Sequence, residues 1–178
     1  MRYLGIIYGV IIAFLKSLFY GKRFSFVLPI RFGGNVKIGI RKGGQICFGK
    51  HVSVNSNTYL AVTENAKIMV GNNSGFGNNN VIVAREAITI GSNVMIGPNV
   101  CIYDHDHVYK GAGVIREQGY INAPIIIEDN VWIGAGVIIL KGVTIGEGSV
   151  IAAGTVVNKD IPANSMVRSK RELIIKNK

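Results

Sequence analysis

The sequence predicts a parallel β-solenoid, an all-β coil in which short strands stack in layers. From residue 88 to residue 157 an aliphatic residue, a spacer, a second aliphatic residue and usually a glycine recur, as in VMIG at 94–97. Two aliphatic residues two positions apart lie on one side of a strand, and a following glycine permits a sharp corner. Strands this short bury little as hairpins, whereas a coil with three strands per layer gives them one continuous core.

The spacing of this repeat contains one large interruption. The second aliphatic position advances by six residues at each step, except for one step of 25; it falls on Ile90, Ile96, Ile102, Ile127, Ile133, Ile139, Ile145, Ile151 and Val157. The repeat is irregular from about Val36 and strict from Ile88. We therefore expect a solenoid over residues 31–164, one long inserted loop at 104–122, and a basic tail at 165–178.

Length and composition agree with one folded domain. A chain of 178 residues can bury one sizeable core, and 48% hydrophobic residues with 23 glycines in phase with the repeat exclude a disordered chain. Cys47 and Cys101 lie between strand-like residues and lack metal or disulfide spacing. Buried free thiols in a reducing cytosol are therefore expected.

The N-terminal segment, residues 1–30, is apolar and then basic. Residues 3–19 are apolar apart from Lys16 and Ser17. This stretch is borderline for crossing a bilayer, and no convincing signal-peptide cleavage site follows it. Two compatible interpretations remain: a helix that caps the open end of the solenoid, or a membrane-surface anchor with basic residues near acidic head groups.

The inserted segment, DHDHVYKGAGVIREQGYIN at 104–122, carries the candidate chemistry. A loop of about twenty residues in a compact domain is uncommon and usually functional. It begins with two of the three histidines of the chain, His105 and His107. Imidazole, with an ordinary pKa near neutrality, suits a general base. The alternative is that both histidines are solvated residues of the loop.

Three stretches of the strict repeat carry a family resemblance: NVWIGA at 130–135, LKGVTIG at 140–146 and KDIP at 159–162. They resemble the hexapeptide-repeat acyltransferases, in the branch of the galactoside and maltose acetyltransferases and the O-acetyltransferases of surface-polysaccharide synthesis. The resemblance covers about residues 36–164. It implies a left-handed β-helix, acetyl-coenzyme A as acyl donor, no metal, and a homotrimer with active sites between subunits.

The resemblance also implies a single catalytic histidine and no covalent acyl-enzyme. Seven residues after Val100, the position that matches this histidine is His107. Asp104 or Asp106 could orient a ring, and the sequence leaves open which one does so. An asparagine on the preceding coil would stabilise the oxyanion; Asn79, within a run of three asparagines, is the candidate, and a structural asparagine ladder is the alternative.

The resemblance implies a coenzyme site along the strict repeat. Small residues leave room for the pantetheine arm, and polar or basic residues suit the phosphates. The matching positions are Trp132, Gly134, Ala135, Lys141, Ala153, Asn158 and Lys159. After Asn164 the chain lacks the Gly-x-Pro-Ala motif of the branch and supplies basic residues instead, at Arg168, Lys170 and Arg171.

The predicted activity is O-acetylation of a sugar hydroxyl in surface-polysaccharide or glycan synthesis, in the cytoplasm or on the inner face of the membrane. The net charge of +10 favours an anionic ligand, and the absence of a base-reading motif argues against nucleic acid. Alternatives are N-acetylation of an amino sugar, a zinc enzyme using His51, His105 and His107, and a non-catalytic scaffold.

Overall fold

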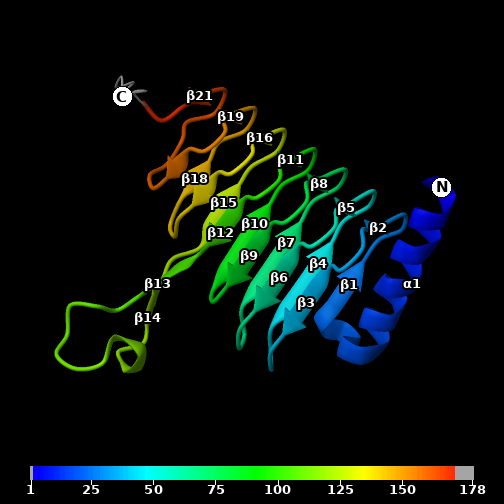
Figure 1. Ribbon diagram of the computed structural model, residues 1–178, viewed down its shortest axis with the longest axis horizontal. Helices are drawn as coiled ribbons and strands as arrows, with labels where there is room; N and C mark the ends of the chain where they lie inside the picture. The colour runs from blue at the N-terminus through cyan, green and yellow to red at the C-terminus, as the bar shows by residue number, and fades with distance from the viewer. Residues whose placement is uncertain (1, 171–178) are drawn as a thin grey trace, which may run out of the picture.

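The computed structural model describes residues 2–170, with side chains from residue 7 onward; the end of the basic tail, including Arg171, lies outside the described residues. The chain forms a three-sided coil of parallel strands with a helix against its N-terminal end (Figure 1). The predicted parallel β-solenoid is confirmed, and its architecture agrees with the left-handed β-helix that the resemblance implies.

Each coil contributes one strand to each of three sheets. Sheet A contains β1 (Phe24–Phe26), β4 (Gln45–Phe48), β7 (Lys67–Val70), β10 (Ala87–Ile90), β15 (Ile125–Ile127) and β18 (Thr144–Ile145). Sheet B contains β2 (Arg31–Phe32), β5 (Ser53–Val54), β8 (Gly75–Phe76), β11 (Met95–Ile96), β16 (Trp132–Ile133), β19 (Val150–Ile151) and β21 (Met166–Val167). Sheet C contains β3 (Lys37–Ile40), β6 (Tyr59–Val62), β9 (Val81–Ala84), β12 (Cys101–Tyr103), β17 (Ile138–Ile139) and β20 (Val156–Val157). The three edges between the sheets are called the AB, BC and CA corners, in chain order.

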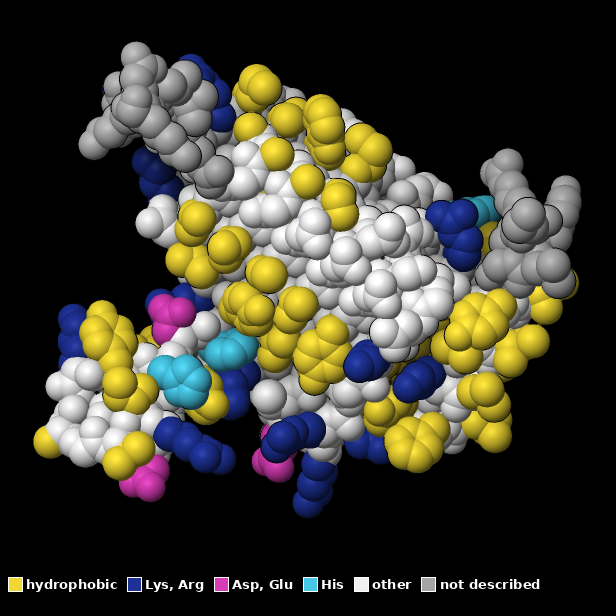
Figure 2. Space-filling view, in the orientation of Figure 1, with side chains coloured by type: hydrophobic (Ala, Val, Ile, Leu, Met, Phe, Trp, Pro, Cys, Tyr) yellow, Lys and Arg dark blue, Asp and Glu magenta, His cyan; other side chains and the backbone are white. Residues whose placement is uncertain are grey.

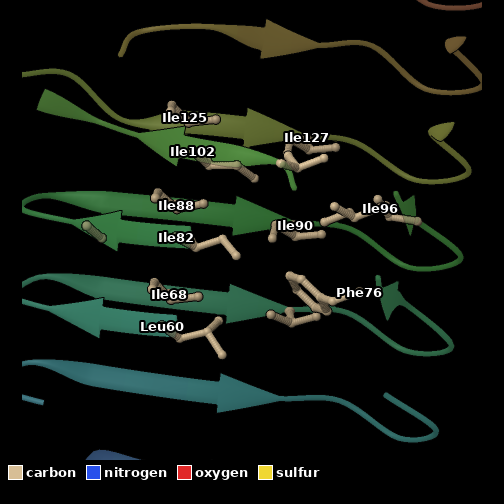
Figure 3. Close-up of a cluster of buried hydrophobic side chains, with 14 of the residues drawn as sticks. Leu60, Ile68, Phe76, Ile82, Ile88, Ile90, Ile96, Ile102, Ile125 and Ile127 are labelled. Carbon is tan, nitrogen blue, oxygen red and sulfur yellow. The ribbon is translucent and has the colours of Figure 1, made fainter. Parts of the chain in front are cut away.

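The repeat positions form the core. All nine second aliphatic positions from Ile90 to Val157 are buried, with exposed fractions of at most 4%. Figure 3 shows how such side chains from successive coils stack inside the solenoid, with Ile88 and Ile90 between the residues of neighbouring coils. The strands alternate inward and outward, so Cys47 and Cys101 lie on the outer side of β4 and β12. Both thiols are free, as expected, but half-buried rather than buried.

The coils differ in length along the solenoid. In the first coils Phe24 pairs with Ile46, and Ile46 with Ile68, so two successive coils contain the same number of residues. In the later coils Ile126 pairs with Thr144, which is a shorter spacing along the chain. The first coils have four-residue strands in sheets C and A, on both sides of the CA corner, which explains why the six-residue repeat is irregular there.

Most corners contain a residue in the left-handed region. Within residues 2–170, ten non-glycine residues have φ between 56° and 61°: Asn35, His51, Asn57, Asn65, Asn73, Asn79, Asn93, Asn99, Asn130 and Asn164. Asparagine tolerates this conformation better than most residues. At the BC corner the column of asparagines changes to glycine in the last two coils, at Gly136 and Gly154.

The helix α1 (Arg2–Tyr20), followed by the short η1 (Gly21–Arg23), covers the first coil. Gly9 lies so close to β2 that a Cβ there would be 3.1 Å from the Cα of Arg31, and Ala13 is fully buried. Phe14 contacts Phe26 edge-on, with ring centroids 5.4 Å apart. These contacts agree with the capping interpretation. Among the described residues, no helix is long and apolar enough to cross a membrane.

The inserted segment leaves the solenoid at the CA corner of the fourth coil and projects away from its body (Figure 1). Its base is an antiparallel ribbon of β13 (His105–His107) and β14 (Tyr120–Asn122), and η2 (Ile115–Glu117) lies between them. The Gln118 side chain bonds the backbone of Gly111 at 3.0 and 3.1 Å, which closes the loop on itself.

Candidate functional site

Asp104 anchors the base of the inserted loop. Its side chain is fully buried, and its carboxylate accepts backbone N–H groups of Arg85 and Glu86, each at 2.8 Å. The same carboxylate lies 3.0 Å from Nδ1 of His105, whose side chain is only 15% exposed. Because the carboxylate joins two coils, the loop leaves the solenoid in a defined direction.

His107 lies on the exposed part of the ribbon. Its ring centroid is 4.4 Å from that of Tyr120, the residue opposite in β14. The guanidinium carbon of Arg85 in turn lies 3.2 Å from the Tyr120 centroid, so the cation stacks on the ring. Within the described side chains, the His107 ring has no hydrogen bond or ion pair. Figure 2 shows two histidine side chains where the protruding loop meets the body.

A small cavity, here called the loop hollow, lies beside His107. Its volume is about 210 Å³, and it is lined by Asp106, His107, Val108, Tyr109, Lys110, Ile121 and Lys141. The Lys141 ammonium lies 2.5 Å from a carboxylate oxygen of Asp106. Lys141 thus lies near the candidate base. Of the two carboxylates that could orient a ring, Asp104 contacts His105 and Asp106 contacts Lys141.

Tyr103 precedes this cluster on β12. Burial, and after it the neighbouring Cys101 thiol, raises the pKa of the Tyr103 hydroxyl above its ordinary value. The phenol therefore stays protonated near neutral pH. Its ring lies edge-on to His105, with centroids 6.0 Å apart. Tyr103, Asp104 and Tyr120 all contact the His105 ring.

Asn79 lies on another edge of the solenoid. It belongs to the BC corner, between β8 and β9, and its Oδ1 accepts the side-chain amide of Asn57 at 3.2 Å. Asn57 in turn accepts the amide of Asn35 at 2.9 Å, so the three side chains form a ladder. In one chain, Asn79 and His107 therefore stand at opposite ends of the sheet C strands.

The predicted coenzyme positions fall into two groups. Trp132, 52% exposed on sheet B, precedes Gly134, Ala135 and Ala153 at the BC corner. A Cβ on Gly134 would be 2.6 Å from the backbone nitrogen of Ala153, so glycine here lets two coils approach closely. The second group, Lys141, Asn158 and Lys159, lies at the CA corner, along the edge that bears the inserted loop.

Arg85 is a site residue that sequence reasoning missed. It follows β9 at the CA corner, as Arg41 follows β3 and Thr63 follows β6. Neighbouring members of this column are separated by the length of one of the first coils, because β3, β6 and β9 pair in register. A search for residues that recur at the length of one of the first coils, rather than every six residues, would have indicated this column.

The third histidine is remote from the other two. His51 occupies the AB corner of the second coil with φ of 61°, a conformation that serves the corner. Among the described residues, no three His, Cys, Asp or Glu side chains group as metal ligands. Within one chain, His51 therefore does not lie beside His105 and His107, where the zinc alternative would place it.

The bacterial transferase hexapeptide family model, of six repeats, matches residues 124–159. A solved mutant of AntD, an N-acyltransferase from Bacillus cereus in complex with dTDP-4-amino-4,6-dideoxyglucose and coenzyme A, has a TM-score of 0.71. It is 17% identical over 92% of this chain and 89% of its own, and shows the fold alone. No curated protein sequence is significantly similar.

Two further solved structures are more similar in sequence. A hexapeptide-repeat acetyltransferase from Vibrio cholerae O1 biovar eltor, complexed with acetyl-coenzyme A, is 29% identical over 85% of this chain and 71% of its own, with a TM-score of 0.53. A maltose O-acetyltransferase from Clostridium difficile 630 is 34% identical over 76% of this chain and 64% of its own, with a TM-score of 0.50. The predicted resemblance to the hexapeptide-repeat acetyltransferases is confirmed.

Proposed function

We propose that this chain is an O-acetyltransferase that transfers the acetyl group of acetyl-coenzyme A to a sugar hydroxyl, in the synthesis of a surface polysaccharide or another glycan. The exposed His107 ring in the loop hollow, at the one long insertion of the repeat, is the observation that carries this proposal. The acyl donor is the ligand of the V. cholerae structure, and maltose O-acetyltransferase is a sugar-modifying relative. Transfer to a sugar amine is the alternative.

The proposed reaction is a direct transfer. The His107 imidazole takes the proton of the acceptor hydroxyl as the oxygen attacks the thioester carbonyl. The C–S bond then breaks, and the coenzyme thiolate leaves with the proton that the imidazolium returns. An N–H donor or the Asn79 amide would stabilise the oxyanion.

His107 suits the role of base better than His105. A base must reach the substrate within hydrogen-bond distance, and His107 lines the loop hollow with an exposed side chain. His105 is tied to a buried carboxylate and mostly covered. We therefore assign His105 and Asp104 to holding the ribbon, and His107 to the proton transfer.

The division of the coenzyme positions between two corners supports a homotrimer. In one chain, the BC corner with Ala135 and Ala153 lies across sheet C from the CA corner with His107. A neighbouring subunit that brings its BC corner to this CA corner would assemble one site from both groups. Asn79 of one subunit would then face His107 of another.

We also propose that the enzyme works at the inner face of the cytoplasmic membrane. The outer surface of α1 carries seven exposed apolar side chains: Ile7, Tyr8, Ile11, Phe14, Leu15, Leu18 and Phe19. Figure 2 shows hydrophobic side chains gathered over this end of the molecule. Lys16, Lys22 and Arg23 lie beside them, a combination that favours an interface with acidic lipid.

Replacement of the proposed base tests the enzymatic function. We expect His107→Ala to lower turnover of acetyl-coenzyme A with a competent sugar acceptor by at least about a hundredfold. His51→Asn is the matched control, because asparagine suits the φ of 61° at that corner, and it should leave turnover unchanged. Full activity in His107→Ala would overturn the assignment. A loss of activity in His105→Ala that His107→Ala does not show would also overturn it.

Vesicle sedimentation tests the membrane proposal. Leu15 and Leu18 are 59% and 86% exposed, so Leu15→Glu with Leu18→Glu should leave folding intact. We expect binding to vesicles of phosphatidylcholine with phosphatidylserine to fall at least about tenfold. The new carboxylates are costly to bury in the apolar part of the membrane, and the anionic lipid repels them. Met166→Glu, at a residue 77% exposed at the other end, is the control. Equal vesicle binding by the native protein, the double variant and Met166→Glu would refute the membrane anchor.

A further inference from the structure

A second cavity lies on the outer face of sheet C, over the first three coils. Its volume is about 440 Å³, within the range of about 300–1,000 Å³ that is usual for small-molecule sites. Its floor consists of the outward-facing residues Gly39, Ala61 and Val83, which pair in register across β3, β6 and β9. Glycine and alanine at two of these positions leave a depression in the sheet. We call this cavity the sheet C hollow.

Two tyrosines form walls of the sheet C hollow. The Tyr59 hydroxyl lies 3.7 Å from where a Cβ of Gly39 would stand, so the ring leans over the floor. Tyr20, the last residue of α1, is held in place by the bond from its hydroxyl to the Ile38 carbonyl oxygen, at 3.0 Å. Aromatic rings held in this way offer flat apolar surfaces with polar ends, which suit a sugar ring.

The remaining wall is cationic. Arg41, Thr63 and Arg85 form the column at the CA corner that borders the hollow. Neither arginine has a carboxylate within ion-pair distance among the described side chains, and no acidic side chain lines the hollow. Within the described residues, Arg85 Nε is the one buried side-chain nitrogen or oxygen that lacks a hydrogen-bond partner. Two unpaired guanidinium groups beside a cavity suit an anion.

The sheet C hollow is connected to the candidate active site. Arg85 borders the hollow and stacks on Tyr120, and Tyr120 stacks on His107. A ligand in the hollow therefore lies next to the base of the inserted loop. Asp104 fixes the backbone of Arg85, so the position of the cation and that of the loop depend on the same carboxylate.

We infer that the sheet C hollow binds an acidic saccharide as the acceptor, with a carboxylate or phosphate at Arg41 and Arg85 and a sugar ring against Tyr59 and Tyr20. This inference rests on the proposed function, since it names the class of sugar that the enzyme acetylates. The acidic group would position a neighbouring hydroxyl toward His107.

Binding measurements without acetyl-coenzyme A test the hollow itself. The probes are glucuronic acid, glucose 1-phosphate and methyl glucoside, titrated by calorimetry into the full-length protein. We expect at least one charged sugar to bind at least about tenfold more tightly than the neutral one, the scale of a charge-assisted hydrogen bond. Whichever charged sugar binds more tightly identifies the acidic group as carboxylate or phosphate.

Arg41→Gln is the critical variant. The Arg41 side chain has no hydrogen bond or ion pair within the described chain, so its removal should leave the fold intact. We expect it to weaken the charged sugar at least about tenfold and to leave the neutral sugar unchanged. Lys42→Gln removes the same charge from the next residue, which does not line the hollow, and should change nothing.

The outcomes separate the hollow from the chemistry. Equal affinity for charged and neutral sugars, or an unchanged affinity in Arg41→Gln, would overturn the inference. His107→Ala should keep the affinity for the charged sugar while it loses acetyl transfer. Arg41-dependent binding with no transfer by the native protein to any acidic sugar would contradict the acceptor role of this hollow, whereas transfer to a neutral sugar in the same assay would leave the proposed function standing.

Discussion

The first three coils and the last two share one core but differ in their corners. The first coils contain more residues than the last and carry asparagine at the BC corner, where the last carry glycine. The extra residues of the longer coils lengthen the sheet C strands toward the CA corner, where Arg41 and Arg85 border the sheet C hollow. The short coils keep their corners small, with alanine and glycine at the proposed coenzyme edge.

This difference indicates that the proposed binding surfaces lie at different positions along the solenoid axis, with the sheet C hollow in the first coils and the proposed coenzyme edge in the last. A core of stacked aliphatic residues depends on strand alternation, which both regions keep. Corner chemistry can vary at the left-handed corner residues, such as Asn57 and Asn79, because their side chains are exposed. The fourth coil, with the inserted loop, is the junction between the two regions.

The largest effect on stability is expected at that junction. Asp104→Ala removes a buried carboxylate that accepts two backbone N–H groups of the third coil and contacts His105. The unpaired N–H groups should lower the free energy of unfolding by about 3 kcal/mol, measured by urea denaturation. Asp106→Asn, at a carboxylate 47% exposed, should cost less than about 1 kcal/mol. Equal losses would mean that Asp104 does not join the two regions.

A smaller effect is expected from tightening the close coil contact at the BC corner. Gly134→Ala places a methyl group 2.6 Å from the backbone of the next coil, and overpacking of this kind costs about 2 kcal/mol. Gly34 occupies the position of the first coil that Ala135 occupies later, and its added Cβ would be 3.9 Å from the nearest atom. Gly34→Ala should therefore leave the denaturation midpoint nearly unchanged. A loss as large as that of Gly134→Ala would contradict this account of the corner.

The smallest effect concerns the change from asparagine to glycine. Gly136 has φ of 66°, and an added Cβ would lie 4.0 Å from the Cα of Gly154, an ordinary contact, so Gly136→Ala should cost about 1 kcal/mol through backbone strain. Gly136→Asn restores the residue found in the first four coils and should cost less. If both variants lose the same stability by thermal denaturation, the asparagine column has no conformational role.

The sequence predicted the elements that depend on local pattern. The aliphatic positions from Ile90 to Val157 are all buried, and the inserted loop stands at the interruption of their spacing. These predictions succeed because inward and outward positions alternate within each strand. This alternation does not depend on the sequence of the neighbouring coil. The half-buried Cys47 and Cys101 follow from the same alternation, with Ile46 and Ile102 beside them facing the core.

The relations between coils were decided by the tertiary structure. Which backbone groups of the preceding coil Asp104 meets, and whether Asn79 shares an edge with His107, depends on how many residues each coil contains. The six-residue phrase does not state this number in the longer first coils, where it is irregular. The Arg41 and Arg85 column arises in the same way. The sequence alone therefore determined a solenoid with a histidine-bearing loop, while coil length, through the register it sets between strands, decided which side chains share a corner.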